Sequence, residues 1–277
     1  MLVEITIKFL KQLAISMYEK IHPLLGKKES GVKISKGAGG DISMNIDLVA
    51  EELLIQILEE NQIDILLISE EIGEKYIGNK NKALLNNQIL IVDPIDGSYN
   101  AARGIPYCSI SIAYAKGNSI NDIEKAVIID LNSKDLFWAE KGEGAFLNDI
   151  SIEVSQLKAS DDCFFELNLP TKTLFNYVEK FRTLIKHNYK VRVMGSSALS
   201  LCQIAKGSID AFINLRESNR LVDVAAGFLI LQEAGGQIFS IDGSKIEADL
   251  SIFLKFPFIA SNYELESHLK SEFCSYF

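Results

Sequence analysis

Apolar residues recur at helical spacing in the first 60 residues of the chain. Over residues 2–22 this spacing predicts an amphipathic helix that ends by Pro23. The same spacing over residues 46–58 predicts a second helix, with Ser43 or Asn45 as its N-cap. Residues 27–45 between them are rich in glycine and charge without a steady period, which predicts a mobile loop or a loose hairpin.

The middle of the chain carries short apolar runs typical of buried strands. Strands are expected at 63–68 and 88–92, followed by an antiparallel sheet of strands 107–115, 124–131 and 135–140. The second half alternates strands and helices, which predicts an α/β layer. These elements are strand 161–167, helix 172–187, strand 189–193, helix 196–206, strand 208–215, helix 223–234, strand 236–241 and a closing helix near 263–273.

This change of pattern predicts two domains that meet near residues 141–155. The first, 1–154, would be an α+β domain with most of the candidate metal ligands, and the second, 155–277, an α/β domain with Asp223 and substrate-binding residues. With 48% hydrophobic residues, the chain has enough apolar side chains for a substantial core. The fold class expected from the pattern is mixed α/β, or α+β.

The candidate chemistry lies in one short stretch, Asp93-Pro94-Ile95-Asp96-Gly97-Ser98, directly after the strand at 88–92. Pro94 and Gly97 are expected to stop that strand, so that both acids lie in a turn at the edge of a sheet. Two converging carboxylates repel each other unless a cation lies between them, and oxygen ligands select Mg²⁺ or Mn²⁺. An ordinary Asp-Pro turn is the alternative.

Charge and cysteine content narrow the function classes. The formal net charge of −9 argues against a general binder of nucleic acid or of anionic membranes. The amino terminus lacks the features of a signal peptide, and no apolar run approaches the roughly 20 residues of a membrane span. The four cysteines form no C-x-x-C pair, which favours reduced thiols in the cytoplasm.

Four separated motifs together resemble the inositol monophosphatase and fructose-1,6-bisphosphatase superfamily. They are Glu70-Glu71, the stretch from Asp93 to Asn100, Gly195-Ser196-Ser197, and Val222-Asp223-Val224-Ala225-Ala226-Gly227. The resemblance covers nearly the whole chain. It implies a layered αβαβα sandwich, Mg²⁺ dependence with Mn²⁺ as a substitute, hydrolysis of a sugar or polyol phosphate, and a homodimer.

The resemblance also implies a set of metal ligands. A first ion would be held by Glu70, Asp93 and the Ile95 carbonyl, and a second by Asp93, Asp96 and Asp223, so that Asp93 bridges them. A third, weaker ion would use Glu70 and waters. The site would therefore hold two or three Mg²⁺ ions, an arrangement suited to in-line displacement at phosphorus without a covalent nucleophile.

The remaining site residues are carried over in the same way. Asp47 and Ser98 would orient and deprotonate the attacking water, with Glu70 as the third catalytic residue. Gly97 and Ser98 would offer backbone N–H groups to the phosphate. Gly195-Ser196-Ser197 forms a small-residue turn into a helix and would line the substrate site. Simple helix capping by Ser98 is the structural alternative.

Departures from the family pattern bear on the substrate. Ser98 replaces the usual Thr and keeps the hydroxyl, whereas Val222 replaces a common Trp and alters a wall of the site. The segment 214–220 is longer than in typical eukaryotic inositol enzymes. Basic residues there and nearby would grip a second phosphate, unless they form an ordinary solvated face. These residues are Arg192, Arg216 and Arg220.

The glycine-rich segment from Lys36 to Asp41 resembles the mobile loop of the archaeal dual-activity fructose-1,6-bisphosphatases. The leading hypothesis is thus an Mg²⁺-dependent phosphatase that cleaves the 1-phosphate of fructose 1,6-bisphosphate and also inositol monophosphate. An inositol-phosphate-only enzyme and an adenosine 3′,5′-bisphosphate phosphatase are the alternatives with the same chemistry. A non-catalytic RNA or polymerase partner on the same fold is the alternative from another class, and the intact acids oppose it. Scattered histidines and the lack of a G-x-S-x-G elbow oppose a Ser-His-Asp hydrolase.

Overall fold

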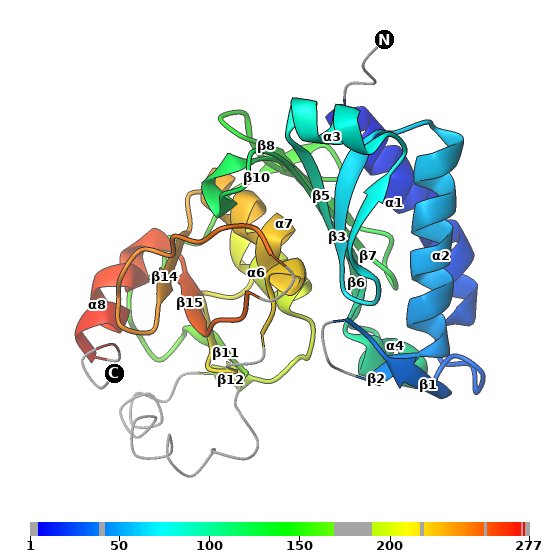
Figure 1. Cartoon of the computed structure of the whole chain (residues 1–277). Helices are drawn as coiled ribbons and strands as arrows, with labels where there is room; N and C mark the ends of the chain where they lie inside the picture. The colour runs from blue at the N-terminus through cyan, green and yellow to red at the C-terminus, as the bar shows by residue number, and fades with distance from the viewer. Residues whose placement is uncertain are drawn as a thin grey trace.

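Helices and β-sheets alternate in layers across the computed structural model (Figure 1). The structure describes residues 5–38, 42–168, 190–216, 219–251, 254–272 and 274. Two amino-terminal helices cover one face of an eight-stranded sheet, two later helices cover its other face, and a five-stranded sheet follows. The expected fold class, a layered α/β sandwich, is confirmed.

The outer layer consists of α1 (Ile7–Ile21) and α2 (Asn45–Glu60). Helix α1 begins later than residue 2 because the Thr6 hydroxyl caps it by accepting a hydrogen bond from the N–H of Phe9 at 3.2 Å. Helix α2 has Met44 as its N-cap, so the expectation of Ser43 or Asn45 was wrong. The acidic side chain of Asp47 satisfies the N-cap by accepting the Met44 N–H at 2.8 Å.

The eight-stranded sheet has the order β10-β9-β8-β7-β6-β5-β3-β4, with β3 and β5 parallel and the other neighbours antiparallel. Its strands are β3 (Ile65–Ser69), β4 (Gly73–Ile77), β5 (Gln88–Asp96), β6 (Ser109–Lys116), β7 (Ile123–Asp130), β8 (Leu136–Glu140), β9 (Gly144–Leu147) and β10 (Ile150–Ile152). The strands expected in this region are confirmed, whereas β4, β9 and β10 were not foreseen.

Strand β5 continues past Val92 and Pro94, so the expectation that Pro94 stops it was wrong, whereas Gly97 directly follows its last residue, Asp96. It pairs with β6 as far as Asp96, which lies opposite Ser109, and its register is irregular between Asp93 and Asp96. A bulge of this kind accommodates a proline without a ladder hydrogen bond. It also turns both acids away from regular strand geometry, and the chain then passes through Gly97 into a short helix.

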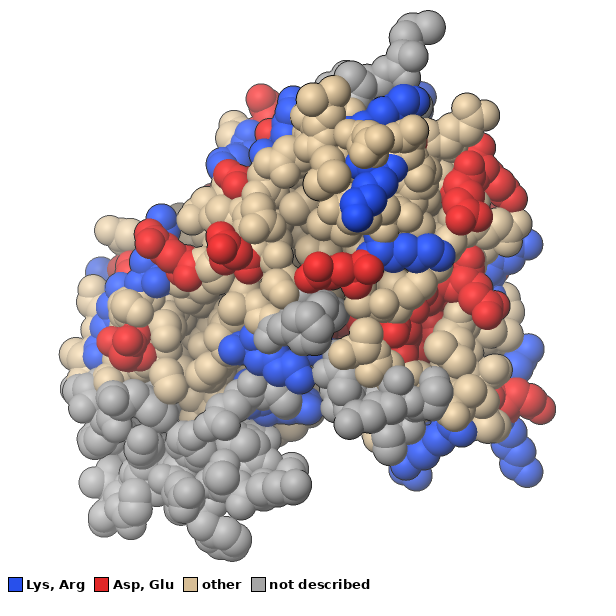
Figure 2. All heavy atoms as spheres, viewed as in Figure 1, with Lys and Arg blue, Asp and Glu red and all other residues tan. Residues whose placement is uncertain are grey.

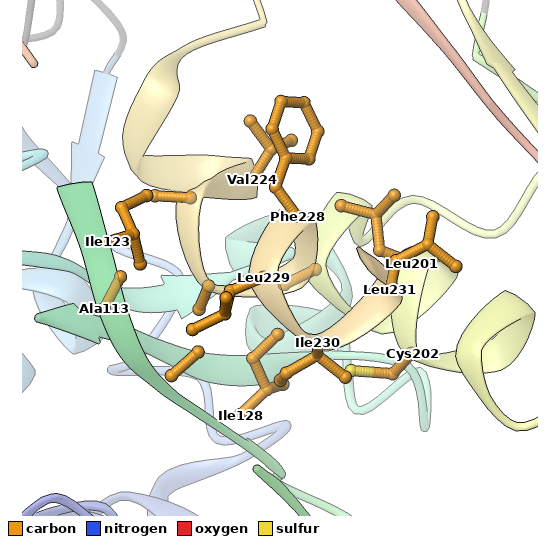
Figure 3. Packing of buried hydrophobic residues seen from close by; sticks show 14 of the residues in the cluster. Ala113, Ile123, Ile128, Leu201, Cys202, Val224, Phe228, Leu229, Ile230 and Leu231 are labelled. Carbon is orange, nitrogen blue, oxygen red and sulfur yellow. The ribbon is translucent and has the colours of Figure 1, made fainter. Parts of the chain in front are cut away.

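Alternation along β5 separates two cores. Leu90 and Val92 pack against α1 and α2, whereas Ile89 and Ile91 face the opposite layer. That layer consists of α6 (Ser197–Ala205) and α7 (Leu221–Glu233). Figure 3 shows α7 packed between the sheet residues around Ile128 and the α6 residues Leu201 and Cys202. Helix α7 is apolar almost all round because it is covered on nearly every side.

The five-stranded sheet has the order β12-β11-β13-β15-β14. Its strands are β11 (Phe164–Asn168), β12 (Lys190–Arg192), β13 (Ala211–Asn214), β14 (Gln237–Ser240) and β15 (Phe258–Ser261). Strand β15 was not expected, and the helix expected at 172–187 lies outside the described residues. The outer face of this sheet packs against α8 (Glu266–Glu272) and the turn before it. The division into domains at residue 154 stays a prediction.

Short elements complete the chain. The glycine-rich segment contains an antiparallel hairpin of β1 (Lys33–Lys36) and β2 (Ile42–Met44), in agreement with the hairpin alternative. The others are η1 (His22–Leu24), α3 (Lys80–Asn86), α4 (Ser98–Arg103), η2 (Ile120–Asp122) and η3 (Tyr263–Leu265). Among the described residues, no helix combines the length and apolar character needed to cross a membrane.

Candidate active site

The irregular end of β5 places Asp93 and Asp96 at the centre of the site. Both side chains are buried, with 1% and 7% of their surface exposed. The carboxylate of Asp93 accepts the N–H of Ile95 at 3.0 Å, which fixes the bulge. The Asp96 carboxylate accepts the Ser196 hydroxyl at 2.5 Å and the Ala198 N–H at 2.7 Å, and is thereby tied to the start of α6.

Residues far apart in sequence add two more acids. Glu70 follows β3, and Asp223 lies in the first turn of α7. Carboxylate oxygens of Glu70, Asp93 and Asp223 lie within 4.8 Å of one another, a spacing at which one cation can contact all three. The parallel pairing of β3 with β5 explains why two strand ends deliver acids to the same place.

Arg220 lies within this acidic group. Its Nη1 donates to Glu70 Oε1 at 2.6 Å, and its Nη2 and Nε donate to Asp223 Oδ1 at 3.1 and 3.2 Å. The sequence suggested Arg220 as a grip for a second phosphate, but its guanidinium here bridges two of the expected metal ligands. Sequence reasoning missed this role because no local pattern shows that a side chain meets Glu70, 150 residues away.

The acids have unusual proton affinities. Burial, reinforced by Glu70 and the other nearby acids, raises the pKa of Asp93 well above its ordinary value. Burial is also the main cause that raises the pKa of Glu70 to about 8 and the pKa of Asp96 to about 7. Arg220 alone therefore leaves these carboxylates short of positive charge. An all-oxygen, highly acidic group of this kind fits hard divalent cations such as Mg²⁺ or Mn²⁺.

Asp47 and Ser98 lie beside this group. Burial raises the pKa of Asp47 to about 6, although its hydrogen bond from Met44 opposes the change. Its Oδ1 is buried and has no hydrogen-bond partner among the described residues. The Ser98 hydroxyl donates to the Ile95 carbonyl at 2.9 Å, the same carbonyl that the family resemblance assigns to a metal ion.

The wall of the site formed by Gly97 and Gly195 is closely packed through its backbone. Gly97 has φ +90°, and a Cβ there would lie 3.1 Å from the Tyr107 carbonyl oxygen and 3.2 Å from that of Gly195. Only glycine adopts this conformation at low cost in so little space. The Asn100 amide donates to the carbonyls of Tyr107 and Met194 at 2.8 and 2.9 Å, which fastens the same three segments together.

These residues surround a cavity of about 390 Å³. It is lined by Asp47, Glu70, Ile95, Asp96, Gly97, Ser98, Tyr99, Asn168, Gly195, Ser197, Arg216, Asn219, Arg220 and Asp223. The structure thus brings most of the predicted site residues together, while Tyr99, Asn168 and Asn219 were not foreseen. Ser196 does not line the cavity, but its hydroxyl donates a hydrogen bond to Asp96, which does.

Two expected residues are placed elsewhere or not described. Arg192 is exposed, lies over the Phe164 ring with its guanidinium carbon 5.2 Å from the ring centre, and is not among the residues that line the cavity. Asp41 and the side chain of Lys36 lie outside the described parts of the chain. On the face that Figure 2 shows, acidic and basic side chains are interspersed.

Comparison with known proteins decides the family. The model of the "inositol monophosphatase family" matches residues 3–276. The chain belongs to the inositol monophosphatase family. The fructose-1,6-bisphosphatase/inositol-1-monophosphatase of Methanothermobacter thermautotrophicus is 35% identical over 277 residues, or 96% of each chain.

Two further proteins are similar over most of this chain. The bifunctional NADP phosphatase/NAD kinase of Methanococcus maripaludis is 35% identical over 93% of this chain, which spans 47% of that longer protein. The crystal structure of an inositol monophosphatase-fructose 1,6-bisphosphatase superposes with a TM-score of 0.82 and 26% identity, covering 96% of this chain and 98% of that one. Both sequence and fold therefore support the family.

Proposed function

We propose that this protein is an Mg²⁺-dependent phosphomonoesterase that hydrolyses the 1-phosphate of fructose 1,6-bisphosphate and also inositol monophosphate. The observation that carries the proposal is the convergence of Glu70, Asp93 and Asp223 at the edge of a cavity that Asp96 also lines. The relatives named for both activities, and the cavity's size, suited to a sugar phosphate, support the same conclusion.

In this proposal two Mg²⁺ or Mn²⁺ ions would be held by Glu70, Asp93, Asp96, Asp223 and the Ile95 carbonyl, and a weaker third ion by Glu70. Bound there, the ions supply positive charge for the phosphoryl oxygens and acidify the attacking water. The chain's own residues then position the reactants. Asp47, ionised above about pH 6, takes the proton of the attacking water, and Ser98 helps to orient that water.

Substrate contacts follow from the lining of the cavity. Gly97 and Ser98 line the cavity, and their backbone N–H groups would bind the phosphate. Gly195 and Ser197, from the turn packed against Gly97, line the same cavity and would contact the substrate. Arg216 lines the cavity and is exposed, so its guanidinium is available to a second phosphate. We propose that substrate is also contacted at the entrance of the cavity by Lys36, Asp41 and Arg192.

The first experiment is phosphate release from fructose 1,6-bisphosphate, inositol monophosphate and adenosine 3′,5′-bisphosphate, each with Mg²⁺ and with EDTA. NADP belongs in the same panel because one relative is named for NADP phosphatase activity. We expect Mg²⁺-dependent release from the first two. An Asp93→Asn variant should lose turnover by about three orders of magnitude or more while staying folded, whereas Asp161→Asn, at an exposed turn, should be unaffected. Full activity of Asp93→Asn would contradict the proposal.

A second substitution tests the choice of substrate. Arg216→Ala should raise KM for fructose 1,6-bisphosphate about tenfold or more, because a charge-assisted contact to the second phosphate is lost. Inositol monophosphate has no second phosphate, so its KM is the internal control and should not change. Equal loss on both substrates would show that Arg216 serves the shared phosphate site or the fold instead.

Three wider expectations belong to the proposal as well. The protein is expected to act as a homodimer in the cytoplasm on a small-molecule substrate, with no nucleic acid and no membrane as partner. The four cysteines are buried free thiols, as expected for a reducing compartment. Light scattering of the purified protein checks the dimer.

A further inference from the structure

Arg220 occupies oxygen atoms that a divalent cation needs. The Asp223 Oδ2 accepts the backbone N–H of Arg220 at 2.9 Å, and Oδ1 accepts both Nε and Nη2 of the same residue. On Glu70, Oε1 accepts Nη1 at 2.6 Å. A carboxylate oxygen has two lone pairs, so the guanidinium uses the accepting capacity of Asp223 Oδ1 and part of that of Glu70 Oε1.

The guanidinium also places a positive charge among the four acids. Arg220 is 8% exposed, and Glu70, Asp93, Asp96 and Asp223 are buried or nearly so around it. When ionised, these four carboxylates carry four negative charges, of which one guanidinium offsets only one. Two divalent cations would supply four positive charges and would then repel the guanidinium at this short range.

The cavity offers the displaced side chain a place to go. Arg220 is one of its lining residues, together with Ser98 and the backbone of Gly97. Arginine has a planar fork of donors that matches two phosphate oxygens as well as it matches a carboxylate. The residue can therefore exchange one anionic partner for another without entering a new region of the protein.

We propose that Arg220 is an internal cation that competes with divalent metal for Glu70 and Asp223, and that metal binding transfers its guanidinium to the phosphate of the substrate. The competition between Arg220 and metal is inferred from the contacts of Arg220 with Glu70 and Asp223. The transfer of its guanidinium to a phosphate rests on the proposed function. Metal and substrate would then bind cooperatively, because metal releases the group that grips the phosphate.

If Arg220 competes with the metal ion, removing the arginine should strengthen metal binding. Replacing Arg220 by Gln removes the rival cation, so Mn²⁺ should bind the metal ligands more tightly, by at least about tenfold. An Arg220 that only braces Asp223 and Glu70 would give the opposite result, since its loss would disorder the ligands and weaken Mn²⁺ binding. Arg220→Lys keeps the charge with a shorter reach and should bind Mn²⁺ much as the wild type does.

The test is a titration of the purified, metal-free full chain with Mn²⁺ in the absence of substrate. The electron paramagnetic resonance signal of the free ion measures how much Mn²⁺ stays unbound. Circular dichroism of each variant, with and without saturating Mn²⁺, shows whether it is folded. If Arg220→Gln folds only when Mn²⁺ is present, the Mn²⁺ concentration needed for folding gives the affinity of this variant for Mn²⁺. That affinity is then compared with the affinity of Arg220→Lys for Mn²⁺. Unchanged or weaker Mn²⁺ binding by folded Arg220→Gln overturns the proposal.

Inorganic phosphate tests the second step. In the Mn²⁺-loaded protein, Arg220→Gln should bind phosphate at least about tenfold more weakly than the wild type, although it binds Mn²⁺ more tightly. Unaltered phosphate binding would overturn the transfer to substrate. If the wild type hydrolyses no phosphate ester and Arg220→Gln still binds Mn²⁺ more tightly, the proposed function fails and the metal competition stands.

Discussion

Glu166 is a buried acid outside the expected ligand set. It lies on β11 with 1% of its surface exposed, and its Oε1 accepts the N–H of Met194 at 3.2 Å, just before the turn at Gly195. Its Oε2 is buried and has no hydrogen-bond partner among the described residues. Burial is the main cause that raises the pKa of Glu166 to about 7. The residue therefore supports the wall of the cavity best when it is neutral.

Replacing Glu166 by Gln should change how stability depends on pH. The pKa is about 7 in the folded protein and about 4.5 in the unfolded chain, so the folded state holds the proton more tightly. The stabilisation is complete below about pH 4.5 and is lost as pH rises through 7, at a cost on the order of 3 kcal/mol. Gln keeps the acceptor for Met194 and does not titrate.

Urea denaturation at pH 5 and pH 8.5, in EDTA, measures this effect. The free energy of unfolding of Glu166→Gln relative to wild type should be higher at pH 8.5 than at pH 5 by up to about 3 kcal/mol. Because all other acids titrate in both proteins, their effects cancel in the comparison. A difference that stays constant with pH would show that Glu166 is already solvated or paired.

At the scale of single residues, sequence predicts which acids come together but not how their charges are balanced. Glu70 follows β3, Asp93 and Asp96 lie in the irregular last part of β5, and Asp223 lies in the first turn of α7, so the ends of elements point to them. The direction of the Arg220 side chain depends on tertiary packing across 150 residues. Asn100, which fastens three segments through two carbonyls, was missed for the same reason.

Helices α6 and α7 approach each other closely at Gly227. A Cβ at this position would lie 2.5 Å from Leu201 Cδ1 and 2.9 Å from Leu201 Cβ. Gly227 lies in the middle of α7, where glycine lowers helix stability by about 0.8 to 1.0 kcal/mol relative to alanine. Close packing with Leu201 therefore outweighs helix propensity at this residue.

Gly227→Ala should lower the free energy of unfolding by about 1 kcal/mol, because overpacking of about 1 to 3 kcal/mol exceeds the gain in propensity. Chemical denaturation of Gly227→Ala, Leu201→Ala and the double variant forms a matched cycle. The double variant should lose less stability than the two single changes added together, since truncation of the Leu201 side chain leaves room for the new methyl group. Strict additivity would mean that the helices move apart to avoid the contact.

At the scale of elements, long periodic helices were predicted well and short strands were not. Helices α1 and α2 follow from their apolar spacing, and α6 and α7 from the alternation of strands and helices in the second half of the chain. Strands β4, β9 and β10 have three to five residues each, too few for a clear alternation. The continuation of β5 to Asp96 depends on pairing with Ser109 of β6, which outweighs the local signal of Pro94.

At the scale of the whole molecule, the site is assembled from distant parts of the chain. Asp93 and Asp96 belong to the eight-stranded sheet and Glu70 directly follows its strand β3, whereas Asp223 lies in the first turn of α7, which packs against that sheet in Figure 3. The family motif predicts this convergence, but periodicity alone does not, because it gives no distance between elements. A cation that contacts Asp93 and Asp223 would therefore connect the sheet to the helix layer.

This arrangement predicts that divalent metal stabilises the whole fold. Metal that binds only the folded protein adds about 2.7 kcal/mol at 100 times its Kd, which raises the thermal midpoint by several degrees in a chain of this size. Asp93→Asn should abolish most of this increase. Without metal, Asp93→Asn should be at least as stable as wild type, because it removes a buried carboxylate yet keeps an oxygen for the Ile95 N–H.

Calorimetry of both proteins at pH 7.5, with EDTA and with saturating Mg²⁺ or Mn²⁺, separates the alternatives. Wild type should melt at or below Asp93→Asn in EDTA and above it with metal, so the order reverses. The Asp161→Asn control should follow wild type in both buffers. An equal metal-induced increase in Asp93→Asn would place the stabilising ion away from Asp93. A lower midpoint for Asp93→Asn in both buffers would show that Asp93 is needed for folding, not chiefly for metal binding.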